Sequence, residues 1–191
     1  LKEMKMIDEG RKAPAFTLAD QDGNKHAIKD YAGKPVVLYF YPKDDTSGCT
    51  LEACQFRDMR PDFKKVKTAV FGISPDSVES HRKFVDKHDL NFTLLADPKD
   101  SSGDPKVCAK YGVWQEKSMY GRKYMGVVRT TYLIDSAGKV ARRWEKVKVP
   151  GHAEAVLEAI KDLRECPPVL DDAGDAKDAG DGAEHNPTGG G

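Results

Sequence analysis

The chain has 191 residues, 39% of them hydrophobic, which is enough for one domain with a buried core. Lys plus Arg and Asp plus Glu each total 31 residues, so the chain lacks the basic excess that is typical of nucleic-acid binding. It has no apolar run long enough to span a membrane, and its first residues lack the apolar core of a signal peptide, which together predict a cytoplasmic protein.

The hydrophobic pattern predicts strands that alternate with helices. In chain order these are strands at 16–18, 26–28 and 36–41, a helix at about 49–59, a strand at 68–74, a helix from Ser77 to about His88, a strand at 93–96, a helix at about 105–111, a loop at 113–126, a hairpin at 128–134 and 139–144, and a helix at about 153–164. This order indicates one α/β domain with a central mixed sheet flanked by helices and an N-terminal β-hairpin.

Residues 167–191 differ in composition from the rest of the chain. They hold six acidic residues and one basic residue, Lys177, among many Asp, Gly and Ala residues. Without them, 30 basic residues face 25 acidic ones, which leaves a modest net charge of +5. Such a segment cannot bury enough apolar surface to fold, so we predict a folded domain at 1–166 and a disordered tail at 167–191.

Cys49 is the strongest candidate for a reactive residue. It follows the apolar strand 36–41 and a turn-rich loop, and it lies where the next helix begins. The backbone N–H groups of a first helical turn stabilise a thiolate, which is the reactive form of cysteine. Its neighbours Ser47, Gly48 and Thr50 are polar or flexible, unlike the surroundings of an inert core cysteine, and Gly48 is a supporting candidate of the site. We therefore predict a nucleophilic thiol at Cys49.

Three further residues complete the predicted pocket. Thr46, three residues before Cys49, can place a hydroxyl beside the sulfur, and Pro42 at the end of the strand can shield it from bulk water. Arg129 directly precedes the apolar stretch at 130–134, where a cation is costly unless an anion faces it. The thiolate of Cys49 would be that anion.

Glu52 is a supporting candidate because it lies one helical turn after Cys49. It can pair with Arg129 or with Arg57 and so hold the pocket in place. An acid in the first turn of a helix is also favourable without any such partner, and the sequence leaves these readings open.

The other cysteines are weaker candidates. Cys54 lies five residues after Cys49 and offers a second sulfur on the same helix. Cys108 lies on an apolar helix face and is predicted to be part of the core, whereas Cys166 borders the tail and is predicted to be accessible. Either of these two could replace Cys54 as the partner of Cys49. The five histidines show no zinc-type pairing with the cysteines, so no metal and no cofactor are predicted.

The chain resembles the peroxiredoxins, and most closely their bacterioferritin comigratory protein subgroup, also called the Q type. The resemblance is carried by the motif Pro-Lys-Asp-Asp-Thr-Ser-Gly-Cys-Thr-Leu-Glu-Ala-Cys at 42–54, and it extends over residues from about 5 to 165. Further matching segments are 56–58, 72–74, 111–114, 120–126, 129–135 and 151–152. One departure is Ser47, where the family usually has proline.

The resemblance implies a thioredoxin-like fold and a thiol-dependent peroxidase that reduces hydrogen peroxide and organic hydroperoxides. By position, Cys49 corresponds to the peroxidatic cysteine and Cys54 to the resolving cysteine of the subgroup. Pro42, Thr46 and Arg129 correspond to the residues that complete the pocket. The resemblance also implies a thioredoxin-type reductant and a monomer.

Helix geometry sets a condition on this scheme. Five residues of a regular helix rise about 7.5 Å, which places the Cα atoms of Cys49 and Cys54 about 8–9 Å apart. A disulfide needs about 4.4–6.8 Å between Cα atoms. We therefore predict that the first one to two turns of the helix unwind whenever this disulfide forms.

Two other classes of function compete with a peroxidase. A general thiol–disulfide oxidoreductase would normally have two residues between its cysteines, whereas four separate Cys49 from Cys54. A non-enzymatic chaperone or redox-sensing partner protein would keep its activity without Cys49.

Overall fold

The computed structural model describes residues 4–165. Cys166 and the predicted tail at 167–191 lie outside these residues, so the predicted domain boundary stays a prediction. Within residues 4–165, none of the helices combines the length and the apolar character that a membrane crossing needs.

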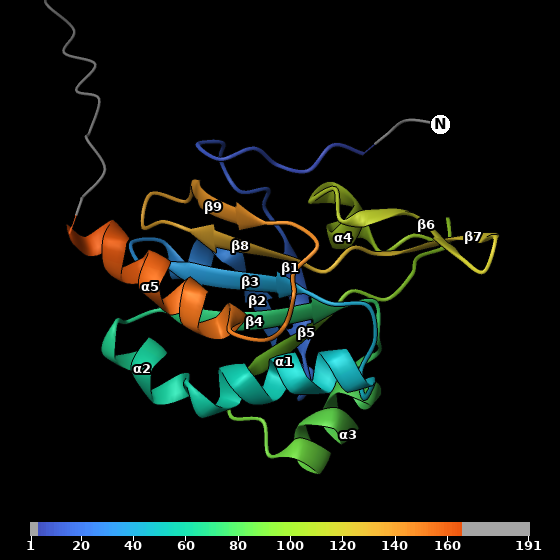
Figure 1. Cartoon of the computed structure of the whole chain (residues 1–191), viewed down its shortest axis with the longest axis horizontal. Helices are drawn as coiled ribbons and strands as arrows, with labels where there is room; N and C mark the ends of the chain where they lie inside the picture. The colour runs from blue at the N-terminus through green and yellow to red at the C-terminus, as the bar shows by residue number, and fades with distance from the viewer. Residues whose placement is uncertain (1–3, 166–191) are drawn as a thin grey trace, which may run out of the picture.

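A seven-stranded mixed sheet forms the centre of the molecule, with the strand order β2-β1-β5-β4-β3-β8-β9 (Figure 1). Its strands are β1 (Thr17–Asp20), β2 (Lys25–Ala27), β3 (Val36–Phe40), β4 (Ala69–Ser74), β5 (Thr93–Ala96), β8 (Thr130–Ile134) and β9 (Val140–Trp144). Strands β3, β4 and β5 are parallel, whereas β1 and β8 join them antiparallel. The predicted mixed sheet and the N-terminal hairpin of β1 and β2 are confirmed.

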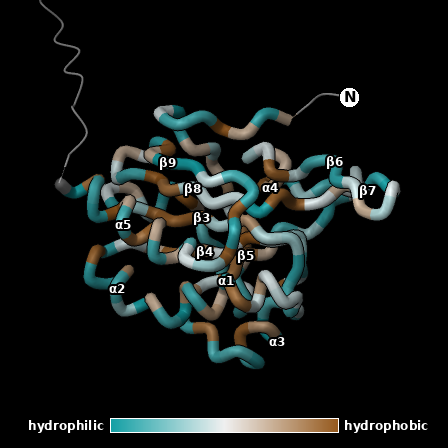
Figure 2. The backbone as a smooth tube through the Cα atoms, viewed as in Figure 1, coloured by the Kyte–Doolittle hydropathy of each residue, from teal (hydrophilic) through white to brown (hydrophobic). Residues whose placement is uncertain are grey.

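Helices cover both faces of the sheet (Figure 1). They are the short 3-10 helix η1 (Ile28–Tyr31) and the α-helices α1 (Ser47–Asp58), α2 (Arg60–Lys65), α3 (Val78–His88), α4 (Lys106–Lys110) and α5 (His152–Glu165). Helices α1, α2, α3 and α5 contribute side chains to the apolar core on one face, and α4 contributes to the core on the other. The hydrophobic stretches lie mainly in the central strands, and hydrophilic stretches follow the outer helices (Figure 2).

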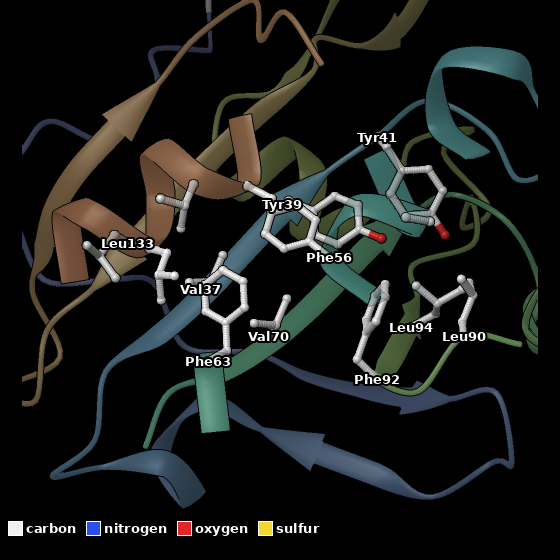
Figure 3. Packing of buried hydrophobic residues seen from close by; sticks show 14 of the residues in the cluster. Val37, Tyr39, Tyr41, Phe56, Phe63, Val70, Leu90, Phe92, Leu94 and Leu133 are labelled. Atoms are coloured by element: carbon white, nitrogen blue, oxygen red, sulfur yellow. The ribbon is translucent and has the colours of Figure 1, made fainter. Parts of the chain in front are cut away.

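The sheet separates these two apolar cores. Successive residues of a strand face opposite sides, so Val37 and Tyr39 of β3 enter one core while Val36 and Leu38 enter the other. All residues of β3 are buried, which confirms the prediction that this strand is central. In the first core the rings of Tyr39 and Phe56 are stacked with their centroids 4.7 Å apart (Figure 3). This stacking fixes α1 on the sheet next to β3.

Two elements differ from the sequence-based expectation. Helix α2 begins directly after α1, and Pro61 lies in its first turn, where the missing N–H of proline costs no hydrogen bond. The stretch 113–126, predicted to be a loop, contains instead the strands β6 (Trp114–Met119) and β7 (Arg122–Val127). Their turn places Tyr120 and Gly121 at φ values of 51° and 76°, as a two-residue hairpin turn requires. This hairpin projects from one end of the molecule (Figure 1).

Candidate active site

Cys49 lies in the first turn of α1, which begins two residues earlier than the sequence predicted, and only 1% of its surface is exposed. Thr46 is the N-cap residue of the helix, but its hydroxyl donates to the carbonyl of Lys43 at 3.0 Å instead of accepting from the first-turn amides. The N–H groups at the start of a helix have no partner within the helix. Around Cys49 they are therefore left to stabilise an anionic sulfur or a bound oxygen.

Arg129 directly faces the sulfur of Cys49. Its Nη2 donates to Cys49 Sγ at 3.2 Å. Strand β8 brings it there, because β8 pairs antiparallel with β3 and places Thr130 opposite Phe40 at the end of β3. The residue before Thr130 therefore lies beside the loop that leads into α1. The predicted approach of Arg129 to Cys49 is present in the structure.

Glu52 fixes the other side of the same guanidinium. Its Oε2 accepts a hydrogen bond from Nη1 of Arg129, whereas Arg57 is directed to Asp58 and to the carbonyl of His88. Of the two partners that the sequence left open for Glu52, the structure therefore selects Arg129. One guanidinium thus bridges a carboxylate and a thiol from successive turns of α1.

Burial makes Glu52 unusual for an acid. It is fully buried, and burial raises its pKa to about 7 although the positive charge of Arg129 acts in the opposite direction. Its second oxygen, Oε1, has no hydrogen-bond partner among the described residues. For Arg129, burial opposes the charged form, but the negative charges of Glu52 and Cys49 prevail and raise its pKa. The cation at the site is therefore permanent.

Gly48 leaves room for this arrangement. A Cβ atom at this position would lie 3.2 Å from Nη2 of Arg129, which is tighter than ordinary van der Waals contact. A side chain here would push the guanidinium away from Cys49. This gives the supporting role predicted for Gly48 a physical cause.

Pro42 and Thr46 lie in the loop between β3 and α1. Pro42 is half-buried, two residues after the end of β3, and Thr46 is exposed. The hydroxyl of Thr46 donates to the carbonyl of Lys43, and the backbone carbonyl of Thr46 accepts from the N–H of Thr50 at 2.8 Å. The Thr46 hydroxyl, which we predicted to lie in the pocket of Cys49, thus makes its described hydrogen bond to Lys43, and its role in the reaction stays a prediction.

Cys54 and Cys108 differ sharply in their position relative to Cys49. Cys49, Cys54 and Cys108 are free thiols, and Cys54 lies half-buried on α1, the same intact helix as Cys49. Cys108 is fully buried in the core on the opposite face of the sheet. Burial, and next the charge of Asp97, raise the pKa of Cys108 well above its ordinary value. Its predicted place in the core is confirmed, whereas Cys166 lies outside the described residues.

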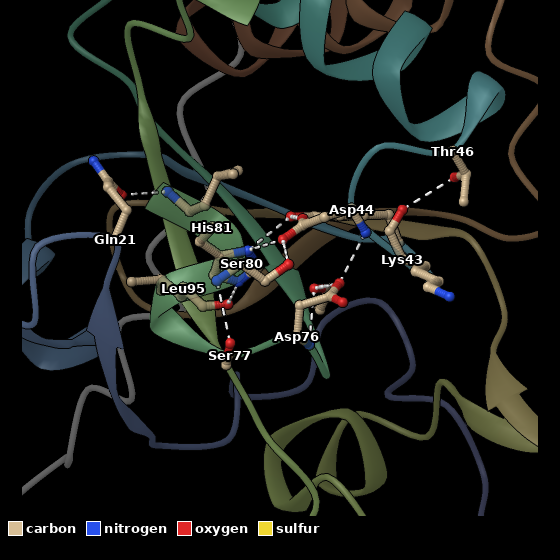
Figure 4. Close-up of polar contacts among 12 residues, drawn as sticks. Gln21, Lys43, Asp44, Thr46, Asp76, Ser77, Ser80, His81 and Leu95 are labelled. Atoms are coloured by element: carbon tan, nitrogen blue, oxygen red, sulfur yellow. Dashed lines mark hydrogen bonds and ion pairs between the residues drawn. The ribbon is translucent and has the colours of Figure 1, made fainter. Parts of the chain in front are cut away.

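A buried polar network that the sequence analysis missed fixes the loop between β3 and α1 (Figure 4). Asp44 is its centre. One oxygen of Asp44 accepts from the Tyr41 hydroxyl at 2.6 Å. The other accepts from the Ser80 hydroxyl at 2.8 Å and lies 2.7 Å from Nδ1 of His81. The backbone N–H of Asp44 donates to Asp76 Oδ2 at 2.9 Å.

His81 links this network to the sheet. Its Nε2 lies 3.0 Å from the carbonyl oxygen of Leu95, which can only accept, so Nε2 carries a proton. Its Nδ1 lies 2.7 Å from Oδ2 of Asp44, so the ring connects the loop before α1 to strand β5. Asp44, Asp76 and His81 have possible ligand atoms within 4.8 Å of one another, but the protein's own donors already occupy both carboxylate oxygens of Asp44 and Oδ2 of Asp76. We therefore assign the network a structural role.

His152 is a second residue near the site whose environment the sequence did not predict. It begins α5, and its Nε2 lies 2.7 Å from the hydroxyl of Thr131 on β8. Burial, and next the charge of Arg129, lower its pKa to about 4. His152 is therefore neutral at physiological pH and adds no charge to the site.

Comparison with known proteins agrees with this geometry. The sequence matches the AhpC/TSA family over residues 10–143. It is 50% identical over 151 residues to the putative peroxiredoxin bcp of Coxiella burnetii, covering 79% of this chain and 97% of that protein. It is 44% identical over 159 residues to the peroxiredoxin Bcp of Bacillus subtilis, covering 83% and 98%. The structure of the bacterioferritin comigratory protein of Xanthomonas campestris superposes with a TM-score of 0.74 at 39% identity, covering 81% of this chain and 98% of that one.

The sheet order, the flanking helices and the thiol at a helix start together define a thioredoxin-like redox protein. The chain belongs to the AhpC/TSA family, as a peroxiredoxin of the bacterioferritin comigratory protein (Q-type) subgroup. The fold and the family expected from the resemblance are thereby confirmed.

Proposed function

We propose that this protein is a thiol-dependent peroxidase in which Cys49 attacks the peroxide and Cys54 resolves the product. The contact between Arg129 Nη2 and Cys49 Sγ, at the uncapped start of α1, carries this proposal. A permanent cation beside a sulfur at a helix start favours the thiolate and provides donors for the negative charge of the reaction.

In the first step the Cys49 thiolate attacks the terminal oxygen of the hydroperoxide in line with the O–O bond. A sulfur–oxygen bond forms, the O–O bond breaks, and the leaving oxygen takes a proton to become water or an alcohol. Arg129 and the first-turn amides of α1 are positioned to stabilise the negative charge on that oxygen. Glu52 holds Arg129 in the required orientation.

In the second step the thiol of Cys54 condenses with the sulfenic acid of Cys49, which releases water and forms a disulfide. Both residues lie within α1, so its first turns unwind to bring the sulfurs together. A dithiol protein of the thioredoxin type then reduces the disulfide by exchange. In the folded state Cys108 cannot take the place of Cys54, because the sheet separates it from Cys49.

The relatives support the same class of substrate. Proteins that share 44–50% identity with this chain are named peroxiredoxins. The Xanthomonas campestris structure is described as that of a protein with alkyl peroxide reduction activity, which favours organic hydroperoxides alongside hydrogen peroxide. The monomeric state, the cytoplasmic location and the identity of the reductant stay predictions.

Single-turnover measurements with the reduced protein test the proposal. Cys49→Ser should abolish peroxide consumption, and Arg129→Met should slow it by about 10²–10³-fold, as the loss of one charge-stabilising donor does. Cys54→Ser should still consume one equivalent of peroxide and retain one added oxygen by intact mass. A Cys49→Ser variant that reduces peroxide at the parent rate would contradict the assignment.

The same variants separate the competing functions. A general thiol–disulfide oxidoreductase would reduce insulin rapidly and leave peroxide unchanged. A chaperone or redox-sensing partner protein would protect a client from aggregation equally well after Cys49→Ser. We expect peroxide loss without substantial insulin reduction, because the intact α1 keeps the two sulfurs too far apart for a stable Cys-x-x-Cys-like pair.

A further inference from the structure

Lys117, on β6 of the projecting hairpin, has an unusual environment for a lysine. Its side chain is half-buried and runs past Gly126 on β7, where a Cβ atom would lie only 3.0 Å from Lys117 Cδ. Its Nζ ends at the carbonyl of Val127 and donates to it at 3.1 Å. The glycine thus provides the space through which this side chain reaches the base of the hairpin.

The base of the hairpin is also the segment that leads to Arg129. Val127 ends β7, two residues before Arg129 and three before the start of β8. The N–H of Val128 donates to the carbonyl of Val113 at 2.8 Å, and the carbonyl of Arg129 accepts from the N–H of Val147 at 3.0 Å. Lys117 therefore adds a side-chain contact to the connection that sets the position of Arg129.

The charges around the candidate active site act on Lys117 as well. Burial, and next the positive charge of Arg129, lower the pKa of Lys117, whereas the negative charge of Cys49 raises it. Among the other neighbours of the site, Glu52 on α1 pairs with Arg129, and His152 on α5 is neutral at physiological pH. On β3, burial keeps the Tyr39 hydroxyl protonated by raising its pKa well above 10. Lys117 is thus a second positive charge near Cys49, in addition to Arg129.

We infer that Lys117 is a positioning residue for Cys49, which holds the Val127–Arg129 connection and supplies a second positive charge that favours the thiolate. The inference rests on the proposed role of Cys49 as the attacking thiol. It assigns a role to the hairpin β6–β7, which precedes Arg129 in the chain. It also explains why position 126 is a glycine, since a larger residue would displace the Lys117 side chain.

The charge and the packing of Lys117 can be tested separately. Lys117→Met keeps a long apolar stem against Gly126 but removes the charge and the donor, and Lys117→Arg keeps the charge. Lys123→Met is the matched control, because Lys123 lies on the paired strand with its side chain 75% exposed and next to Glu116. The rate at which iodoacetamide alkylates Cys49 is measured against pH in the full chain, with the modified residue located by mass spectrometry.

We expect Lys117→Met to lower the thiolate fraction of Cys49 at neutral pH by a factor on the order of three to ten, because one nearby positive charge is lost. Single-turnover peroxide reduction should slow by a similar factor. Lys117→Arg should restore most of both values, and Lys123→Met should leave both unchanged.

Two results would overturn the inference. One is a Lys117→Met profile that coincides with that of Lys123→Met. The other is a slower peroxide reaction with an unchanged alkylation profile and a lower melting temperature, which would show a purely structural role. Failure of the proposed function is distinguishable from both, because it would appear as full peroxidase activity in Cys49→Ser.

Discussion

The two chain segments on either side of Cys49 are held in place very differently. On the N-terminal side, the loop from β3 is fixed by Asp44, whose carboxylate takes part in three hydrogen bonds and whose partner His81 is bonded at both ring nitrogens. On the C-terminal side, helix α1 contains Glu52 and Gln55, each with a buried side-chain oxygen that lacks a partner among the described residues. Cys49 therefore lies between a segment whose buried polar groups are hydrogen-bonded and a segment with unpartnered buried oxygens.

This difference shows how the site can change shape without losing its pocket. A buried polar atom without a partner costs free energy in the folded state, and unwinding exposes it to water and removes that cost. The segment after Cys49 therefore loses less on opening than its burial suggests. The loop before Cys49 would lose several buried hydrogen bonds and is expected to stay in place. Oxidation should thus move Cys54 and leave Asp44 fixed.

The largest expected change in stability comes from disrupting the hydrogen-bond network of Asp44. Asp44→Asn replaces one acceptor oxygen of a buried carboxylate with an NH2 group, which disrupts its hydrogen bonds, and should lower the free energy of unfolding by about 3 kcal/mol. Asp45→Asn is the matched control, because Asp45 is the exposed neighbour and its pairs with Lys87 and His88 lie at the surface. Urea unfolding of the two variants gives the comparison.

Amide hydrogen exchange then shows whether the network of Asp44 stabilises the loop before Cys49. In the oxidised protein, the amides of residues 41–46 should keep their protection while those of 50–55 lose it. In Asp44→Asn, protection should fall on both sides. Equal stabilities for Asp44→Asn and Asp45→Asn would show that the network does not hold the loop.

A second prediction concerns Glu52 and the pH dependence of the free energy of unfolding. The pKa of Glu52 is raised from 4.5 to about 7 by burial, so the folded protein binds more protons than the unfolded chain between these values. The free energy of unfolding should therefore fall as the pH rises from about 4.5 to about 7, by up to about 3 kcal/mol. Glu52→Gln should remove this fall while keeping an oxygen that accepts from Arg129.

Thermal unfolding of the parent and of Glu52→Gln across this pH range tests the prediction. Glu79→Gln provides the control, since Glu79 is a helical glutamate, on α3, that is exposed. Parallel pH profiles for the parent and Glu52→Gln would mean that Glu52 does not titrate in this window.

The smallest effect is expected at position 48, where one substitution should change stability and activity in opposite directions. Gly48→Ala should stabilise the start of α1 by up to about 1 kcal/mol through higher helix propensity. The added Cβ would displace Arg129 by a few tenths of an ångström, which should slow peroxide reduction by about three- to tenfold. Ser47→Ala, at the exposed neighbouring position, should leave the rate unchanged. A Gly48→Ala variant that is both more stable and fully active would show that the close approach does not matter.

The sequence predicted those features that depend on local patterns. The apolar run that forms β3, the glycine-containing loop and the following helix start place Cys49 without any knowledge of the rest of the chain. Arg129 was found because an arginine at the edge of an apolar strand requires a partner. The partner of Glu52 was left open, because two arginines lie within plausible reach in sequence and only the sheet pairing selects one.

Features that depend on distant contacts could not be predicted in this way. Asp44 and His81 are 37 residues apart, and neither belongs to a spacing that indicates a contact. The hairpin β6–β7 was missed because its turn places Tyr120 at positive φ, a position where asparagine, aspartate or glycine would have given the signal. Helix α2 was not predicted because Pro61 can mark the end of a helix, although proline is equally compatible with the first turn of the next one.

The sheet between the two cores separates two buried thiols, Cys49 and Cys108, whose chemical labelling can report on two different events. Cys49, the proposed site of peroxide attack, lies in one core, whereas Cys108 is fully buried in the other core and should react with a thiol reagent only when the structure opens. Pulse labelling of one sample can therefore record chemical turnover at the first cysteine and global unfolding at the second. The protein thus contains its own internal standard for distinguishing an inactivated molecule from an unfolded one.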